Sequence, residues 1–429
     1  MRWYGWLATA CVCVSLTQQV IADDWDDPWA DEATSSGFAV HGFYELAAGG
    51  RLQRDPLLGR DMTLGEGRAR VEMSDYLGDL RWSLKTDLYA DGVEDKQRLD
   101  LREALIDFQV GQNMDVRLGQ QVLTWGTGDM LFLNDLFAKD WQSYFSGRDD
   151  EYLKAPASSA KVSYFTESVN LDLVWTPEFQ SDRYIRGDRF SYFSAMSGTQ
   201  MAAPEGRIRP QSRDRWGRES QWAARLYGTH EATEWALYAY RGYWTQPLGM
   251  TTTGDAFFPR LDVYGASLRT PFKGGIANAE LAWYEGSDSA GDHPGLPNDQ
   301  LRFLLGYDRE LRPNFNAAVQ YYLEWTQDYS GLKSTWPVAD GRYRPDEYRH
   351  LLTLRLTQRL RQDNLTLSLF SYWSPSDRDY YLRPSVNYRV DDHWTLTLGG
   401  NLFGGKKSHT FFGQFEDASN LYARLRYSY

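Results

Sequence analysis

The chain closes with the stretch LYARLRYSY, residues 421–429, in which two kinds of side chain alternate strictly. Successive side chains of a β-strand point to opposite faces, so the odd-numbered residues share one face and the even-numbered residues the other. The first face is apolar and ends in two tyrosines, and the second carries two arginines. Taken alone, the stretch is typical of a half-buried terminal strand of a soluble sandwich.

The same alternation recurs through most of the chain after Gly37. Clear examples are residues 80–89, 315–325 and 394–402, where apolar side chains fall on every second position. Helical spacing would scatter these side chains around a cylinder, so the pattern predicts strands. About 18 segments of this kind can be counted, with 16 as the alternative, and each has the length that a tilted membrane strand needs. Their approximate centres are residues 43, 68, 84, 104, 118, 162, 172, 223, 237, 264, 280, 304, 320, 354, 368, 385, 397 and 425.

The connections between these segments alternate between short and long. Short turns such as 76–78, 111–113 and 273–275 alternate with polar loops rich in Gly, Pro and Asp. A barrel with short periplasmic turns and long extracellular loops produces this rhythm, whereas a soluble β-sandwich, the alternative, has no reason to. Unpaired backbone groups are costly in hydrocarbon, so such a sheet must close. The sequence predicts an all-β fold: one closed antiparallel transmembrane β-barrel over residues 37–429. The longest loops are 126–157, 177–217, 286–298, 327–345 and 403–419.

The composition agrees with a membrane barrel. Aromatic residues make up 15% of the chain and include 17 tryptophans, although the mean hydropathy is only −0.58. Barrels need aromatic belts at two interfaces and turn only every second residue to lipid, which accounts for both numbers. The net charge of −12 argues against a nucleic-acid partner.

The N-terminus has the features of a secretory signal. Arg2 precedes an apolar core, and small or apolar residues lead up to Ala22, so we expect residues 1–22 to be a signal peptide cleaved near Ala22. Both cysteines, Cys11 and Cys13, lie inside it, with a lipoprotein site at Cys11 as the alternative. Residues 23–36 are expected to form an acidic periplasmic tail. The predicted location is the outer membrane of a Gram-negative bacterium.

The strand faces predict a channel lining. If the apolar set of each strand faces lipid, the other set faces the lumen, and this set is rich in basic side chains. Rings of Arg and Lys favour anions, although lumenal arginines can also brace a barrel by pairing with acids. The predicted pore-lining residues are Arg68, Arg70, Arg81, Lys85, Arg102, Arg117, Arg225, Arg302, Arg355, Arg383, Arg389, Arg424 and Arg426. The acidic candidates are Glu72, Asp87, Asp107, Asp172, Asp262, Glu280, Asp308 and Glu324.

Two long loops are candidates for narrowing the pore. Loop 126–157 holds the apolar run Met130, Leu131, Phe132 and Leu133, which burial inside the barrel or over its mouth would remove from water. It is therefore the predicted constriction loop. Loop 177–217 carries seven arginines and predicts either a basic vestibule for anions or a contact with lipopolysaccharide phosphates.

The mature chain resembles Gram-negative outer-membrane β-barrel channels of the porin type. RLGQQVLTWG, residues 117–126, is similar to a strand-end pattern of porin-like families, alginate-export-like barrels among them, with Gln120 where those families often have Arg. LYARLRYSY is similar to their C-terminal assembly signal, with Leu425, Tyr427 and Tyr429 as the residues that match. The resemblance implies a passive or substrate-preferring channel, for an acidic saccharide or another small anion. It also implies outer-membrane lipids, lipopolysaccharide and the barrel-assembly machinery as partners.

Two other classes of function stay open at this point. An outer-membrane hydrolase would need a catalytic His arrangement, and only Asp292-His293 in an external loop is a candidate. No nucleophile elbow, zinc spacing or phosphate loop occurs, so we expect no enzyme activity, cofactor or metal. A structural or assembly barrel of an envelope export machine would use the same fold, with periplasmic contacts through residues 23–36.

Overall fold

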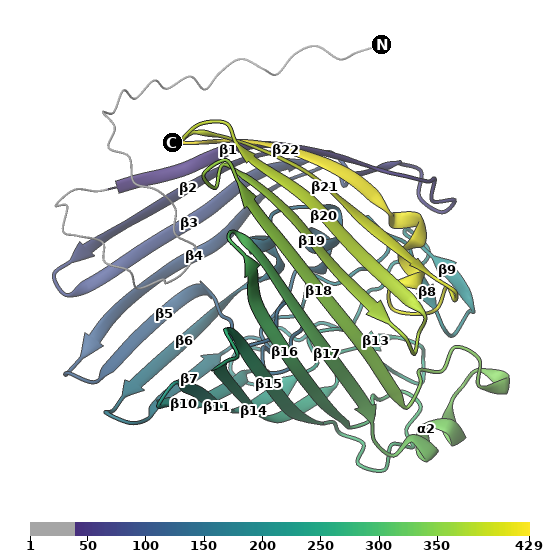
Figure 1. Ribbon diagram of the computed structural model, residues 1–429. Helices are drawn as coiled ribbons and strands as arrows, with labels where there is room; N and C mark the ends of the chain where they lie inside the picture. Colours follow the sequence, from purple (N-terminus) through teal and green to yellow (C-terminus); the bar gives the residue numbers. More distant parts are fainter. Residues whose placement is uncertain (1–38) are drawn as a thin grey trace, which may run out of the picture. The chain divides into compact units, whose positions relative to one another are not determined.

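The structure, a computed structural model, describes residues 39–429. The predicted signal peptide and all of the acidic tail lie outside the described residues. Within them, eighteen strands form one antiparallel sheet in which each strand pairs with its neighbours in the chain. The last strand pairs with the first, so the sheet closes into a barrel (Figure 1). The predicted fold class and strand number are confirmed, and every predicted strand centre lies inside a strand of the barrel.

The barrel strands are longest near the N-terminus and shorten toward loop 123–155. In chain order they are β1 (Ala39–Arg51), β2 (Met62–Leu77), β3 (Leu80–Asp91), β4 (Lys96–Val110), β5 (Met114–Val122), β6 (Pro156–Phe165), β7 (Asn170–Thr176), β10 (Gln221–His230), β11 (Thr233–Tyr243), β14 (Arg260–Phe272), β15 (Gly275–Glu285), β16 (Gln300–Arg312), β17 (Phe315–Thr326), β18 (Tyr348–Leu360), β19 (Leu365–Ser374), β20 (Asp379–Arg389), β21 (Trp394–Gly405) and β22 (Asn420–Ser428).

The long loops contain the remaining elements. None of the helices in residues 39–429 is long and apolar enough to cross a membrane. Two small hairpins and the helix α2 lie at the end of the barrel away from the C-terminus (Figure 1). These elements are α1 (Trp141–Ser146), η1 (Asp150–Leu153), β8 (Tyr192–Ser194), β9 (Thr199–Met201), β12 (Gly249–Met250), β13 (Ala256–Phe257), α2 (Tyr329–Thr335), η2 (Ala339–Gly341) and η3 (Gly413–Ala418).

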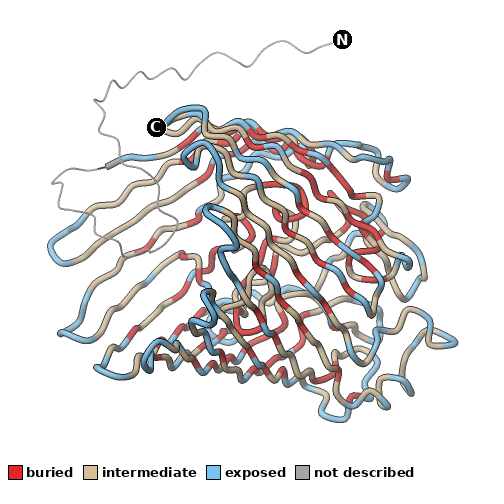
Figure 2. The backbone as a smooth tube through the Cα atoms, viewed as in Figure 1, coloured by how far each residue is buried: buried red, intermediate tan, exposed pale blue. Residues whose placement is uncertain are grey.

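The two faces of the sheet differ as the alternation requires. On β3 the outward Leu88 is 59% exposed, whereas its neighbour Asp87 on the inner face is fully buried. Exposed leucines and aromatic residues recur on the outer face of most strands, so the barrel presents an apolar exterior to its surroundings. Figure 2 shows buried segments inside the barrel and toward the end with the long loops, while the tight turns are exposed.

The seam of the barrel joins the two ends of the described chain. The Tyr429 amide donates to the Gly42 carbonyl at 3.0 Å, and the Gly42 amide donates to the Tyr429 carbonyl at 3.2 Å. The Tyr429 hydroxyl donates to the backbone carbonyl of Arg70 at 3.0 Å. Tyr429, which follows β22, therefore connects the end of β22 to β1 and β2.

Candidate constriction and lumenal cavity

The loop between β5 and β6, residues 123–155, lies against the inner face of the barrel. Its first part is held by Glu280 of β15, whose carboxylate accepts hydrogen bonds from the backbone amides of Thr127 and Gly128 and from the Asn134 side chain. The last two of these bonds are both 2.7 Å long. Hydrogen bonds to a charged group are among the stronger ones, so Glu280 fixes the start of the loop.

The tip of the loop reaches the opposite wall. Asp129 accepts two hydrogen bonds from Arg355 of β18, each 2.6 Å long. In the order of the ladder β18 is the ninth strand after β5, half-way around a barrel of eighteen. Because the loop begins on one side of the barrel and pairs with the other, it crosses the lumen.

The second half of the loop folds into α1 and η1 before returning to β6. The Asp140 carboxylate caps α1 by accepting from the Ser143 amide at 2.8 Å, and Gly147 ends the helix with φ of 91°, a conformation that suits glycine. Asp149 then accepts from Arg424 of β22 at 2.8 Å. Burial would raise the pKa of Asp149, but the Arg424 and Arg426 guanidinium groups outweigh it and lower this pKa.

A buried ionic cluster joins the same part of the loop to β2 and β3. Arg70 donates to Asp87 at 2.6 Å and to the Tyr152 hydroxyl at 2.7 Å, and Arg148 pairs with Glu66. Removing one member of a buried pair leaves an uncompensated charge and costs about 3–5 kcal/mol. The cluster therefore holds residues 148–152 firmly on the wall.

The predicted pore-lining residues other than Arg102 lie on the inner face, because each stands opposite an inner-face residue of a neighbouring strand. Arg102 lies at an irregularity of β4 and is placed on the inner face by its hydrogen bonds to the loop. Most of them form ion pairs with carboxylates or hydrogen bonds with the constriction loop. Arg383 donates to Asp150 at 2.6 Å, and Arg102 donates to the backbone carbonyls of Glu151 and Lys154. Direct lining of a water-filled pore stays a prediction for these residues.

One acidic candidate was assigned to the wrong face. Asp262 lies on the outer face, because its neighbours Leu261 and Val263 are the buried, inward residues of β14. It stands opposite the outward Arg241, 3.8 Å away. Strand β14 carries apolar side chains on both faces, so alternation alone does not fix its orientation.

Several inner acids were missed in the sequence. Glu45 and Glu66 are buried on β1 and β2, and Asp129, Asp149 and Asp150 come from the loop. Together they compensate much of the basic excess that the sequence predicts for the wall. The signal for Glu45 and Glu66 is present, since each occupies an inward position; the loop acids required knowledge of where the loop folds.

Loop 177–217 also folds against the barrel rather than standing free. Arg189 is buried and pairs with Asp91, and Arg183 donates to Asp100 at 2.6 Å. Arg186, Arg207, Arg213 and Arg215 each have a carboxylate partner as well. These pairs reduce the basic charge expected of a vestibule.

The apolar run of the constriction loop has a place to pack. Leu133 is 1% exposed, and Met130, Leu131 and Phe132 lie against a large aromatic cluster inside the barrel. This cluster includes inner-face tyrosines of β15, β17, β19 and β20, such as Tyr284 and Tyr381. Sequence reasoning missed the cluster because tyrosines on the inner face were not separated from those of the outer belts.

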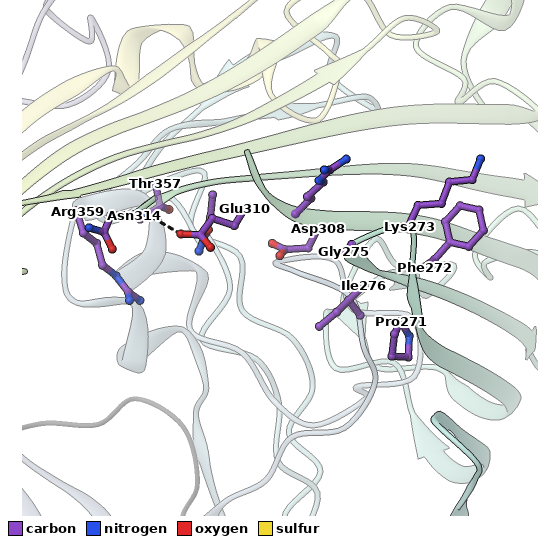
Figure 3. A pocket seen from close by; sticks show the side chains of 13 residues that line it. Pro271, Phe272, Lys273, Gly275, Ile276, Asp308, Glu310, Asn314, Thr357 and Arg359 are labelled. Atoms are coloured by element: carbon purple, nitrogen blue, oxygen red, sulfur yellow. Dashed lines mark hydrogen bonds between the residues drawn. The ribbon is translucent and has the colours of Figure 1, made fainter. Parts of the chain in front are cut away.

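Two hollows lie at opposite ends of the barrel. At the tight turns, an open hollow of about 730 Å³ is lined by charged residues such as Asp308 and Arg359 and by apolar ones such as Phe272 and Ile276 (Figure 3). Toward the long loops, a second cavity of about 370 Å³ lies between the constriction loop and the inner faces of β11 and β14–β19. Its lining is mainly aromatic, with Trp244, Tyr284 and Tyr322 among the residues.

Residues 39–429 offer little for the hydrolase alternative. His293 lies in an exposed loop, where its ring nitrogen Nδ1 accepts from the Gly295 amide at 3.1 Å. Its backbone amide donates to Asp288 at 2.7 Å, so the contacts are those of a turn. No group of three metal-ligating side chains is present in this part of the chain.

Residues 89–429 match the family described as "Protein of unknown function (DUF1302)". The chain belongs to this family. The match covers most of the barrel, and the family description gives no activity. No curated protein matches the sequence of this DUF1302 member significantly.

The fold of this DUF1302 member is similar to solved structures of Gram-negative outer-membrane porins. OccAB4 of Acinetobacter baumannii has a TM-score of 0.56 and 8% identity, with 92% of this chain and 98% of that chain covered. OccK11 (OpdR) of Pseudomonas aeruginosa has a TM-score of 0.53 and 12% identity, with 91% and 95% covered. OpdL of the same species has a TM-score of 0.52 and 12% identity, with 92% and 99% covered. At these identities the likeness concerns the fold, and the predicted resemblance to porin-type barrels is confirmed.

Proposed function

We propose that the protein is a channel of the Gram-negative outer membrane that passes small solutes selectively. The apolar outer face of the closed barrel supports insertion in a bilayer, because a closed sheet leaves no unpaired edge in hydrocarbon. A signal peptide at residues 1–22, assembly through Leu425, Tyr427 and Tyr429, and contact of the arginine-rich loop with lipopolysaccharide remain parts of this proposal.

The observation that carries the proposal is the crossing of the lumen by residues 123–155. An eighteen-stranded barrel without such a loop leaves a wide aqueous channel. Here the loop pairs with β2, β15, β18, β20 and β22, so that a solute must pass between its side chains and the wall. A narrow passage lined by specific groups selects among solutes, which a wide one does not.

Anions are the solutes we propose to be preferred. Arg81, Arg225 and Arg389 lie on the inner face, and none of them has an ion-pair partner among the described residues within 4.0 Å. The Arg389 guanidinium donates to the neutral Asn364 side chain at 3.0 Å. The three guanidinium groups are not bound directly to a carboxylate, so among the predicted pore-lining arginines these three are the most available to an anion in the lumen. The proposal involves no catalytic step.

Conductance of the purified protein in planar bilayers tests whether it is a channel. The reversal potential under a salt gradient tests whether the channel prefers anions. We expect single-channel steps and a reversal potential of the sign for anion selectivity. Replacing Arg81, Arg225 and Arg389 together by Gln should move that potential toward cation selectivity. The matched control replaces Arg241, Arg260 and Arg309 by Gln, because these arginines of β11, β14 and β16 are exposed and are not among the residues that hold the constriction loop, so the reversal potential should not change.

Each outcome bears on one part of the proposal. Absence of conductance in wild-type protein, together with no solute entry in a liposome-swelling assay, would refute the channel. Cation selectivity of the wild type, or an unchanged reversal potential in the first triple variant, would refute the anion preference and leave the channel standing.

A further inference from the structure

The cavity of about 370 Å³ on the long-loop side differs from the rest of the lumen in its chemistry. Aromatic side chains from the wall and from the loop surround it, among them Phe132, Trp141, Trp244 and Phe412. Its volume lies within the range of small-molecule sites, which are mostly apolar with a few placed polar groups. At about 30 Å³ for each water, the space would hold roughly a dozen water molecules against largely apolar walls.

The charged groups that line this cavity cancel one another. Arg302, Glu324 and Arg349 stand side by side on β16, β17 and β18, because each is opposite the next in the register. Arg302 is 3.6 Å from Glu324, and Arg349 is 2.9 Å from Asp377. Lys139 is 2.9 Å from Asp135 on the loop. The cavity lining holds three basic side chains (Lys139, Arg302, Arg349) and three acidic ones (Asp135, Asp182, Glu324), so it carries no net charge that would require a strongly anionic occupant.

Two hydrogen-bond donors at this cavity are buried without an acceptor in the described structure. One is the indole N–H of Trp244, a residue only 7% exposed, and the other is Nη2 of Arg349. Both residues line the cavity, and neighbouring side chains cover both donor atoms, so an acceptor reaches these donors when those side chains shift on binding. A buried donor left unpaired costs about 1–3 kcal/mol, so such groups call for a partner. Since both atoms can only donate, the partner must present acceptor oxygens.

We propose that this cavity binds a solute with an apolar ring body and an oxygen acceptor group, a carbonyl or a carboxylate, which Trp244 and Arg349 hydrogen-bond. Ring faces of the lining residues receive the apolar body, and Arg302, which lies 3.9 Å above the Tyr284 ring, keeps that ring in place. The inference rests on the proposed function, because the cavity would be a binding site on the path of the solute, on the long-loop side of the constriction.

Equilibrium binding by calorimetry on the purified, detergent-solubilised barrel tests the site independently of transport. The probes are hydrocinnamate (ring and carboxylate), benzylacetone (ring and neutral carbonyl), butylbenzene (ring alone) and propionate (carboxylate alone). We expect saturable binding of one or both of the first two and none of the last two. Hydrocinnamate binding alone would assign the acceptor as a carboxylate, and benzylacetone binding alone would assign it as a carbonyl.

Three variants locate the binding. Trp244→Phe keeps the ring and removes the donor, and Arg349→Gln removes the guanidinium; each should weaken binding about fivefold or more, the usual value of one hydrogen bond. Trp222→Phe is the matched control, because Trp222 is 55% exposed and lies outside the cavity lining. Binding that is unchanged in the first two variants, or equally strong for butylbenzene, would overturn the inference. Conductance without binding would overturn this inference alone, and binding without conductance would overturn the channel proposal alone.

Discussion

At the scale of single residues, Asp129 at the tip of the constriction loop and Asp149 in its second half both pair with arginines of the wall, but their pKa values shift in opposite directions. Burial raises the pKa of Asp129, helped by the nearby Asp150 and Asp308 carboxyls, and the Arg355 guanidinium offsets this only in part. The arginines at the other end lower the pKa of Asp149 below its ordinary value. The docked loop therefore binds a proton at Asp129 more tightly, and at Asp149 less tightly, than the released loop would.

The signs lead to a pair of matched predictions. The docked loop is favoured when Asp129 is protonated, that is, as the pH falls through its raised pKa. Asn resembles the protonated carboxyl, so Asp129→Asn should keep the loop docked and the conductance low from neutral to mildly acidic pH.

Asp149→Asn removes a charge-assisted hydrogen bond to the wall. The fraction of undocked loop should therefore rise about tenfold, and the conductance should rise with it. Conductance recorded across this pH range checks both variants. Equal behaviour of the two Asn variants would contradict the assignment.

At the scale of elements, the seam between β1, β2 and β22 depends on the absence of a side chain at Gly42. A Cβ built on Gly42 would collide with the backbone carbonyl of Arg70 and with the Tyr429 ring. Backbone cannot move aside as the end of a flexible side chain can. The C-terminal strand, whose alternation predicts the barrel, therefore also closes the barrel by packing closely against Gly42.

Gly42→Ala is accordingly expected to destabilise the closed barrel by about 1–3 kcal/mol, the usual cost of overpacking. The loss should appear as a lower temperature at which the barrel loses its compact mobility in detergent gel electrophoresis. Gly67→Ala on β2 is the control, because the nearest atom to a Cβ there is Leu46 Cδ2 at 3.7 Å, an ordinary contact. Equal melting of the two variants would show that the seam tolerates a methyl group at Gly42.

At the scale of the whole molecule, the sequence predicts the strands of the barrel wall better than the loop and the cavity inside the lumen. Alternation determines the strands and the inward face of residues such as Arg70, because a closed membrane barrel needs apolar side chains at every second position. It fails at Asp262, where both faces of the strand are apolar. It also cannot show that Asp129 reaches Arg355, since 226 residues separate the two and no local pattern encodes their pairing. The aromatic cavity is missed for the same reason, because its lining comes from many separate strands and from the loop.

A last prediction is that residues 123–155 dock on the barrel wall and leave it as a single unit. A protein beginning at Asp23 has no cysteine, so Asp129→Cys and Arg355→Cys introduce the only pair of thiols. A short bis-maleimide across this pair should hold the tip on β18 and cancel the conductance gain of Asp149→Asn, because the two anchors belong to the same loop. Each single-cysteine variant treated with the same reagent is the control. A linked triple variant that conducts as strongly as the unlinked one would contradict this prediction, because the conductance gain of Asp149→Asn would then not require release of the loop tip from β18.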